Sequence, residues 1–276
     1  MKTVHDLLTL SWEFAKSKNP NVLRRDVEEL IAHRLGMKRL DLYVFFDRPI
    51  EEKELPAIRD GLKRLIQDEP LEYIVGECTF SGCRIKVTKD VLIPRPETEW
   101  LVEKIVTQLK EVESGTFLDL CCGSGYIGIA VKKKLPQLQV LLSDISPAAL
   151  AIARENAKVN DVEVSFLEGD LFQPLQKQMV DFLACNPPYI SQKEFSQLDP
   201  SVAKFEPHMA LVSGPTGLEM YERLAREVKQ YVKESVFLEI GATQGKAVAD
   251  LFHAAGYQHV QVCKDLSDHD RYVIIS

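Results

Sequence analysis

Residues 186–189, Asn-Pro-Pro-Tyr, directly follow an apolar strand-like run and carry the most distinctive chemistry of the 276-residue sequence. An amide or aminopurine nitrogen is a poor nucleophile, because its lone pair is delocalised into the adjacent π system. A site that accepts both N–H hydrogens holds the nitrogen toward tetrahedral geometry and leaves its lone pair facing an electrophile. The side-chain carbonyl of Asn186 can accept one hydrogen, and the backbone carbonyl of Pro187 the other. The pattern therefore predicts a clamp for a planar NH₂ group.

Two prolines and a tyrosine suit the remainder of such a site. Pro187 and Pro188 have restricted φ angles and no N–H donor, so their carbonyls can point outward at little entropic cost. Tyr189 offers a flat face that can cover a planar substrate group. The alternative is a strand that merely ends in a proline turn, and the cofactor elements that precede the motif weaken this alternative.

A loop earlier in the chain fits the binding of a nucleoside-bearing cofactor. Residues 119–125, with the sequence DLCCGSG, lie between a strand-like run and a helical run. Its candidate binding residues are Cys121, Cys122, Gly123, Ser124 and Gly125. Glycines let a backbone pass close to a ligand, and a helix N-terminus presents unpaired N–H groups. Taken alone, an ordinary strand-to-helix turn explains the loop equally well.

Two acids beyond this loop strengthen the cofactor interpretation. Asp144 ends the next strand-like run, about 20 residues past the loop, where an acid accepts both ribose hydroxyls in nucleotide-type sites. Asp170 lies at the tip of the third run and can bond an adenine amino group, with Leu171 beside the ring. The alternatives are an N-cap role for Asp144 or Ser146 and a loop-capping role for Asp170.

The first 70 residues predict a small helical bundle. Apolar residues at 3.6-residue spacing predict helices over 21–36 and 51–68. Asn21 is expected to cap the first helix and Gly36 to stop it, while Pro56 must lie in the first turn of the second.

The alternation of apolar residues changes after this bundle. Residues 72–90 predict two extended runs around Ser81-Gly82, which form a hairpin that connects two domains. We therefore expect three parts: a helical bundle at 1–71 for substrate docking or stability, a β-hairpin linker at 72–91, and a larger domain at 92–276.

The larger domain alternates strands with helices. Strand-like runs lie at 116–121, 140–145, 164–169, 180–185, 236–241, 260–265 and 271–276. Helical runs begin with Pro96 and continue at 126–135, 147–159, 217–231 and 244–255. The first strands are apolar on both faces, as a parallel sheet between two helix layers requires, and the last two are close enough to pair antiparallel. The prediction is an α/β doubly wound sheet.

Composition limits the class of function. Residues 1–95 hold 17 basic and 16 acidic side chains, whereas residues 96–276 hold 17 and 25, a net charge of −8. An electrostatic grip on nucleic acid normally needs a basic face, which the larger domain lacks in composition. No stretch reaches the roughly 20 apolar residues of a membrane span, and no signal peptide is evident, so we expect a cytoplasmic protein. Six cysteines without CxxC spacing and six scattered histidines predict free thiols and no metal site.

Five segments together resemble the release-factor glutamine N5-methyltransferases. They are LIPRPETEWLVE (92–103), DLCCGSG (119–125), SDISPAAL (143–150), NPPYI (186–190) and FEPHMAL (205–211). The resemblance runs essentially from end to end. NPPY alone is shared with adenine-N6 methyltransferases, whereas its combination with PRPET and FEPHMAL is much more specific. The resemblance implies a class I methyltransferase fold, S-adenosylmethionine as methyl donor, and the glutamine of the Gly-Gly-Gln loop in class I peptide chain release factors as substrate.

The resemblance also implies roles for individual residues. Cys121 to Gly125 would form the cofactor loop, Asp144 would bind the ribose, and Leu171 would lie beside the adenine. Asn186, with the carbonyl of Pro187, would hold the glutamine amide, and Pro188 and Tyr189 would complete the substrate pocket. Residues 94–98 would line the mouth of the site or act as a hinge.

One departure from the family pattern concerns the cofactor loop. The family loop usually begins with glycine, whereas Cys121 and Cys122 occupy the first two positions here. A cysteine has a Cβ and adopts φ > 0 only at a cost. We therefore expect ordinary backbone angles at both cysteines, with their side chains packed as buried apolar filler.

Two other functions are weighed against this one. NPPY suits any conjugated amine, so an adenine-N6 or guanine-N2 methyltransferase acting on DNA or RNA is the main alternative. Such enzymes usually have a basic groove and a place for a flipped base, and the charge of −8 argues against both that activity and a stable nucleic-acid partner. A non-catalytic binding module is disfavoured by the presence of both Asn186 and Asp144. We expect a monomer.

Overall fold

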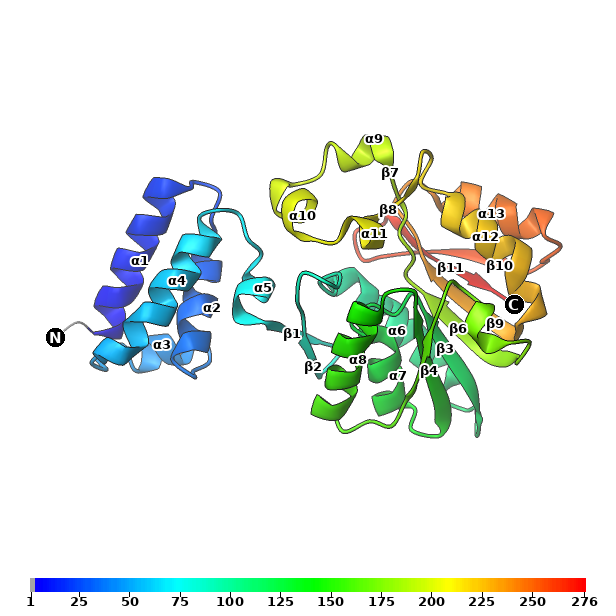
Figure 1. The fold of residues 1–276 in the computed structure, drawn as a ribbon, viewed down its shortest axis with the longest axis horizontal. Helices are drawn as coiled ribbons and strands as arrows, with labels where there is room; N and C mark the ends of the chain where they lie inside the picture. The colour runs from blue at the N-terminus through cyan, green and yellow to red at the C-terminus, as the bar shows by residue number, and fades with distance from the viewer. Residues whose placement is uncertain (1–2) are drawn as a thin grey trace. The chain divides into compact units, whose positions relative to one another are not determined.

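The computed structural model describes residues 3–276, which form two compact units (Figure 1). The first unit contains the chain up to Glu77 together with Asp199–Phe205. The second contains Cys78–Leu198 and Glu206–Ser276. The chain therefore leaves the second unit after Leu198 and re-enters it at Glu206.

The first unit is a helical bundle. Its elements are α1 (Val4–Lys18), α2 (Arg24–Arg34), α3 (Asp41–Val44), η1 (Glu52–Glu54), α4 (Leu55–Leu65), α5 (Leu71–Val75) and α10 (Pro200–Phe205). The predicted helices at 21–36 and 51–68 correspond to α2 and α4, and Pro56 lies in the first turn of α4 as expected. The predicted cap was wrong, because Leu23 occupies the N-cap position of α2 and Asn21 lies two residues outside it.

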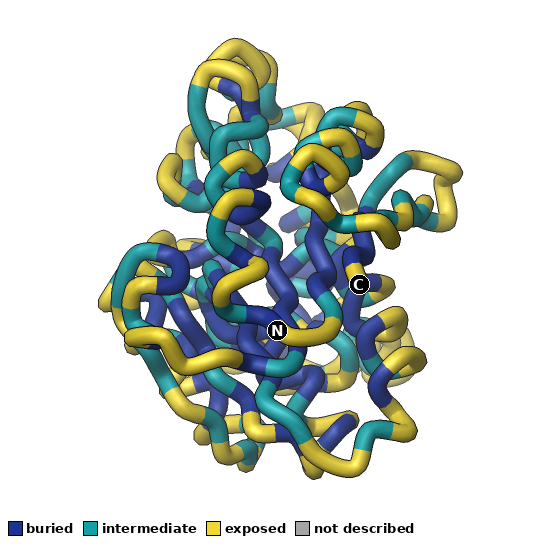
Figure 2. The backbone as a smooth tube through the Cα atoms, turned by 90° about the vertical axis from the view of Figure 1, so that its right-hand side faces the viewer, coloured by how far each residue is buried: buried dark blue, intermediate teal, exposed yellow. Residues whose placement is uncertain are grey.

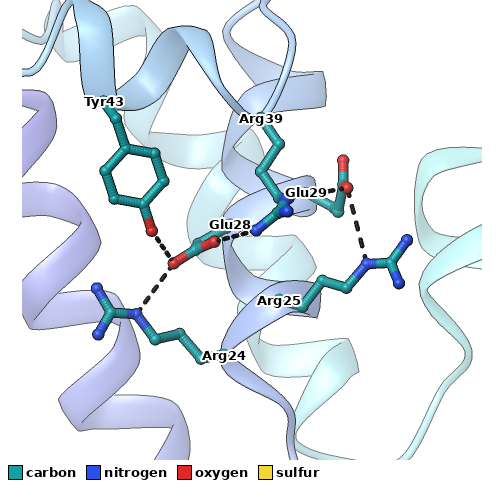
Figure 3. A network of polar contacts seen from close by, with 6 residues as sticks. All are labelled: Arg24, Arg25, Glu28, Glu29, Arg39 and Tyr43. Carbon is teal, nitrogen blue, oxygen red and sulfur yellow. Dashed lines mark hydrogen bonds and ion pairs between the residues drawn. The ribbon is translucent and has the colours of Figure 1, made fainter.

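A buried carboxylate joins α2 to α3 (Figure 3). Glu28 accepts hydrogen bonds from Arg24 (3.0 Å), Arg39 (2.9 Å) and the hydroxyl of Tyr43. Burial alone would raise the pKa of Glu28, but the hydrogen bonds from Tyr43, Arg39 and Arg24 outweigh it, so the pKa is lowered. Arg39 also pairs with Glu29 at 3.3 Å. The network fixes the short α3 against α2.

The hairpin is shorter than predicted. Its strands are β1 (Glu77–Phe80) and β2 (Cys83–Lys86), joined by Ser81 and Gly82 with φ of 46° and 76°. The expectation of an extended run from residue 72 was wrong, because residues 71–75 form α5. This helix follows Pro70 and ends at Gly76 with φ 87°, and it buries Tyr73 and Ile74.

Asn156 ties this hairpin to the remainder of the second unit. Its Oδ1 accepts from the Lys86 N–H (2.7 Å), and its Nδ2 donates to the carbonyls of Lys86 (3.0 Å) and Ser124 (2.9 Å). The side chain is fully buried. Asn160 bonds the backbone of Arg84 in the same two-way manner. Two amides on one helix therefore fix the hairpin, and one of them also fixes the 119–125 loop.

The second unit has a seven-stranded sheet with the order β10-β11-β9-β6-β3-β4-β5. The strands are β3 (Gly115–Leu120), β4 (Leu138–Asp144), β5 (Ser165–Glu168), β6 (Val180–Cys185), β9 (Val232–Glu239), β10 (Val260–Lys264) and β11 (Asp270–Ile275). The five strands from β9 to β5 are parallel, and β11 is antiparallel to both of its neighbours. All seven predicted strands overlap these, and the predicted antiparallel finish is confirmed.

Helices cover both faces of this sheet (Figure 1). One layer contains α6 (Pro96–Leu109), α7 (Tyr126–Lys134) and α8 (Pro147–Val159). The other contains α12 (Glu219–Glu227), η3 (Val228–Gln230) and α13 (Gly245–Ala254), and η2 (Gln173–Leu175) follows β5. The predicted α/β doubly wound sheet is confirmed.

Residues 190–214 were not assigned to elements from the sequence. They form β7 (Ile190–Ser191), α9 (Gln192–Phe195), α10, α11 (His208–Leu211) and β8 (Val212–Gly214), with β7 and β8 paired as a separate small sheet. These pieces are too short to show a periodic apolar pattern.

The register of the parallel strands aligns one row of residues. Leu120 pairs with Ser143 on one side and with Cys185 on the other, and Cys185 pairs with Leu238. The next residue of each strand is therefore delivered to the same edge of the sheet. These next residues are Cys121, Asp144, Asn186 and Glu239.

Burial follows this plan (Figure 2). The central strands are buried along most of their length, whereas the helices alternate buried with exposed residues. None of the helices in residues 3–276 combines the length and apolar character that crossing a membrane requires.

Candidate functional site

A cavity of about 240 Å³ opens at the carboxyl ends of β3, β4 and β6. The predicted site residues that line it are Cys121, Gly123, Asp144, Asp170, Leu171, Asn186 and Pro188. Cys122, Ser124, Gly125, Pro187 and Tyr189 lie in the same loops without lining it. The structure thus brings part of the predicted cofactor set and the Asn186 half of the predicted NH₂ clamp to one cavity, whereas Pro187, the other half of the clamp, does not line it.

The backbone at Cys121 differs from the prediction. Its φ is 58°, in the left-handed region, whereas ordinary angles were expected. The loop turns sharply at this point, so that the next N–H, that of Cys122, donates to the Ser143 carbonyl at 3.0 Å. A non-glycine residue in this region costs roughly 1–2 kcal/mol, which the surrounding loop must offset. The Cys122 side chain is buried as expected, while that of Cys121 is only partly buried and lines the cavity.

Asp144 links the cofactor loop to the helix that follows. Its Oδ2 accepts from the Gly123 N–H (2.8 Å) and its Oδ1 from the Ser146 N–H (2.9 Å). Ser146, not Asp144, is the N-cap of α8, since its hydroxyl accepts from the Ala149 N–H at 3.2 Å. Burial raises the pKa of Asp144, and the hydrogen bonds from Ser146 and Gly123 oppose the rise.

The second predicted acid, Asp170, has a partner that the sequence did not indicate. Asp170 Oδ2 accepts from Arg223 Nη2 of α12 at 2.7 Å, and both residues line the cavity. The neighbouring Leu171 is almost fully buried and has φ 47°, so its apolar side chain forms part of the wall. A carboxylate has about four acceptor positions, so the ion pair leaves Asp170 able to accept further hydrogen bonds.

Asn186 has its amide orientation set by one neighbour. Its Nδ2 donates to the hydroxyl of Tyr126 at 2.9 Å. Because a carboxamide is planar, its Oδ1 points away from that hydroxyl. Both residues line the cavity, and Asn186 is partly exposed to it, so the arrangement offers a carbonyl acceptor to a ligand.

The backbone of Tyr189 is held by a side chain from outside the motif. The Tyr189 carbonyl accepts from Gln244 Nε2 at 2.9 Å, and the same nitrogen contacts the Gly217 carbonyl at 3.2 Å. A Cβ at Gly217 would lie 2.6 Å from the Tyr189 carbonyl oxygen, so only glycine fits there. Burial and the nearby Glu239 raise the pKa of Tyr189 to about 12, with Arg271 opposing the rise.

The segment before α6 lines the cavity, but with other residues than those predicted. Residues 90–92 line it, whereas 94–98 do not. Arg95 instead pairs with the buried Glu206, whose other oxygen accepts from the Ile93 N–H at 3.3 Å. This partly buried ion pair joins the PRPET and FEPHMAL segments.

Two buried acids lie near the site and were not predicted. Asp119 is fully buried, and burial raises its pKa to about 8, although the Gly128 N–H donates to Oδ2 at 2.8 Å. Glu239 is also buried, which raises its pKa to about 7. The sequence did contain a signal, because each acid directly follows apolar residues of its strand, Phe117-Leu118 before Asp119 and Val236-Phe237-Leu238 before Glu239.

The polar groups around the 119–125 loop fit a nucleoside-bearing cofactor. Within residues 3–276, Asp119 Oδ1, Ser124 Oγ and Ser143 Oγ are buried without a hydrogen-bond partner, and Ser143 lines the cavity. Buried polar groups are normally paired, so unpaired ones beside a cavity indicate a polar ligand. The same stretch of chain holds no group of three His, Cys, Asp or Glu side chains placed to bind a metal.

Comparison with known proteins identifies relatives over nearly the whole chain. Residues 13–76 match the PrmC N-terminal domain family, and residues 97–203 match the methyltransferase small domain family. The release factor glutamine methyltransferase of Chlamydia trachomatis serovar L2 is 50% identical over 272 residues, covering 98% of this chain and 92% of the relative. That of Thermodesulfovibrio yellowstonii is 37% identical over 257 residues and 91% of each chain.

Solved structures are similar in fold. The hMettl16 catalytic domain in complex with the MAT2A 3′UTR hairpin 6 aligns with a TM-score of 0.56 and 14% identity, over 82% of each chain. The 16S rRNA N2 G1207 methyltransferase of T. thermophilus aligns with a TM-score of 0.53 and 13% identity, over 72% of this chain and 49% of that one. Identities this low concern the fold alone, which is that of the class I methyltransferases.

The buried Asp119 should make stability depend on pH. Its pKa is raised on folding, so its contribution is fully present below the unfolded-state pKa and is lost as pH rises to about 8. We expect Asp119→Asn to remove a slope of about 1.4 kcal/mol per pH unit between these values. Urea unfolding of both proteins from pH 5 to 9 measures this. Glu239 titrates in both proteins and cancels, so equal slopes would contradict the assignment.

Proposed function

The chain belongs to the release factor glutamine methyltransferases, and from this premise we propose that its cavity binds S-adenosylmethionine beside the amide clamp. The acceptor is the side-chain nitrogen of the glutamine in the Gly-Gly-Gln motif of class I peptide chain release factors. The observation that supports the assignment most directly is the position of Asn186, which lines the same cavity as Gly123 and Asp144 and has its Nδ2 turned to the Tyr126 hydroxyl.

The cofactor roles follow from the contacts around the 119–125 loop. Asp144 would accept the ribose hydroxyls with the lone pairs that its two backbone hydrogen bonds leave free. Cys121 and Gly123 would pass beside the amino-acid portion, and Asp170 and Leu171 would contact the adenine. When bound, S-adenosylmethionine would supply a methyl group activated by its positively charged sulfur, and the carbon–sulfur bond would break to leave S-adenosylhomocysteine.

The clamp has the task of making an amide nitrogen nucleophilic. Asn186 Oδ1 accepts one hydrogen of the glutamine NH₂, and the Pro187 carbonyl accepts the other. Both acceptors hold the nitrogen away from planarity, so its lone pair is less delocalised and faces the cavity. Because the methylated nitrogen carries a positive charge, it is acidic and loses a proton readily, and no strong base is required. Placement of the reacting groups therefore supplies much of the catalysis.

Pro188 and Tyr189 would complete the substrate pocket. Pro188 lines the cavity, whereas Tyr189 lies behind it and is anchored through its carbonyl. We therefore assign Tyr189 the task of holding the motif in place, with its ring available to cover the substrate glutamine only at the edge of the cavity.

A nucleic-acid substrate is the second candidate. One of the solved structures above is a complex with an RNA hairpin and the other is an rRNA methyltransferase, but their low identity limits the comparison to the fold. The acidic composition of residues 96–276 and the relatedness of residues 13–76 to the PrmC N-terminal domain favour a protein substrate. We further infer a monomeric enzyme that acts in the cytoplasm, where its substrate is used.

Transfer of labelled methyl groups tests the function directly. We expect the purified protein with methyl-labelled S-adenosylmethionine to label a release factor, and to leave unlabelled a release factor in which the Gly-Gly-Gln glutamine is replaced by asparagine. DNA and tRNA serve as parallel substrates. Label in either nucleic acid but not in the release factor would refute the proposal.

Substitution of the clamp residue should separate catalysis from binding. We expect Asn186→Ala to lower the methyl-transfer rate by roughly 100-fold or more, as for other lost transition-state contacts. Affinity for S-adenosylmethionine, measured by calorimetry, should change less than twofold. The exposed Asn21→Ala is the matched control, since it removes the same group outside the cavity. Normal turnover by the Asn186 variant would show the clamp to be wrong.

Substitution of Asp144, the proposed ribose-binding acid, should instead weaken cofactor binding. We expect Asp144→Ala to weaken S-adenosylmethionine binding roughly ten- to hundredfold, the effect of a lost hydrogen bond to a charged group. Asp144→Asn is the control, because it retains one acceptor oxygen for the Gly123 and Ser146 N–H groups and should be impaired less. Unchanged cofactor affinity in the alanine variant would exclude Asp144 from the binding site.

A further inference from the structure

Among residues 3–276, Tyr126 is the one side chain with a hydrogen bond to the side-chain amide of Asn186. We propose that Tyr126 is a positioning residue, whose hydroxyl holds the Asn186 carboxamide in the orientation that presents Oδ1 to the substrate. The inference rests on the proposed role of Asn186 and adds a residue to it. In this proposal Tyr126 does not contact the reacting atoms and acts only through Asn186.

The need for such a residue comes from the symmetry of a carboxamide. The amide of Asn186 can rotate by half a turn, which exchanges its oxygen and its NH₂ at almost no change in shape. In the rotated state it would present two donors to the substrate NH₂, which needs acceptors. Only the state with Nδ2 on the Tyr126 hydroxyl, at 2.9 Å, places the acceptor on the cavity side.

A hydroxyl selects this state only if it acts as an acceptor toward Asn186. Burial and the nearby negative charge of Glu239 raise the pKa of Tyr126 well above its ordinary value, so the hydroxyl keeps its proton. Because Nδ2 can only donate, the Tyr126 oxygen is the acceptor in this 2.9 Å contact, and the hydroxyl's own proton points elsewhere. Glu239 is the residue that the sheet register places beside Asn186, one position past the Cys185–Leu238 pair.

The tyrosine itself is fixed on its other sides. It is the first residue of α7, immediately after Gly125, whose φ of 79° turns the chain into the helix. A Cβ at Gly125 would lie 3.0–3.2 Å from Leu142, Ala153 and Ile129, so the turn is tightly packed. Phe80 of the hairpin packs edge-on against the Tyr126 ring, at 4.9 Å between centroids and 82° between planes. The ring is almost completely buried.

Tyr126→Phe isolates the hydroxyl, because it keeps the ring and its packing on Phe80. We expect the single-turnover rate of methyl transfer to a release factor to fall roughly tenfold, the upper range for one neutral hydrogen bond. The affinity for S-adenosylmethionine and the KM for the release factor should stay within twofold. Tyr257→Phe is the matched control, since that ring also packs against a phenylalanine, Phe252, and does not line the cavity.

A spectroscopic measurement tests the orientation without relying on activity. The side-chain NH₂ signals of Asn186 can be assigned by their loss in Asn186→Ala. Their hydrogen exchange should be protected in the wild type and at least about tenfold faster in Tyr126→Phe, since one hydrogen bond is lost. The melting temperature of each variant separates local release of the amide from general destabilisation.

The outcomes distinguish this inference from the proposed function. A transfer rate within twofold of wild type, or unchanged exchange of the Asn186 NH₂, would overturn the role of Tyr126 and leave the function intact. Failure of the wild type to methylate the release factor would overturn the function, while the exchange measurement would still decide whether Tyr126 holds the amide.

Discussion

The parallel register of β4, β3, β6 and β9 is the constraint on which the site depends. Four residues that are far apart in the sequence, Cys121, Asp144, Asn186 and Glu239, each follow one paired row and so emerge at the same edge. A shift of one residue in any strand would turn its functional side chain to a helix layer. The apolar residues that hold this register, such as Leu118 and Leu183, are fully buried and therefore determine the chemistry indirectly.

Concentrating polar groups at one edge has an electrostatic consequence. Asp119, Asp144 and Glu239 all have raised pKa values, for which burial is the main cause. A bound cofactor with a positive sulfur would reduce the cost of keeping such groups ionised, so ligand binding and the charge state of this edge are coupled. The site therefore contains its own group of acids, in addition to the net negative charge of residues 96–276 that disfavours nucleic acid.

Periodicity and motif spacing were sufficient for the sheet, its helix layers and most of the cavity residues. Asp144 and Asn186 were identifiable because each polar residue directly follows an apolar run. What the sequence could not supply were contacts between distant side chains. Arg223 of α12 donates to Asp170, and Gln244, at the N-cap of α13, donates to the Tyr189 carbonyl. Neither residue belongs to a recognisable motif in the sequence. The positive φ of Cys121 could not be predicted from residue preference. It accompanies a hydrogen bond from the Cys122 N–H to the Ser143 carbonyl of the neighbouring strand, which only the folded structure shows.

The short segment Asp199–Phe205 belongs to the bundle by its contacts, although the chain on both sides of it belongs to the sheet unit. The polypeptide therefore crosses between the units three times, near residues 77, 198 and 205. No single cut can release either unit whole, because removal of the first 77 residues would separate α10 from the rest of its unit. The excursion that contains α10 begins at Asp199, shortly after β7 and α9. Fragments meant to represent the catalytic unit alone would need this excursion shortened or replaced as well.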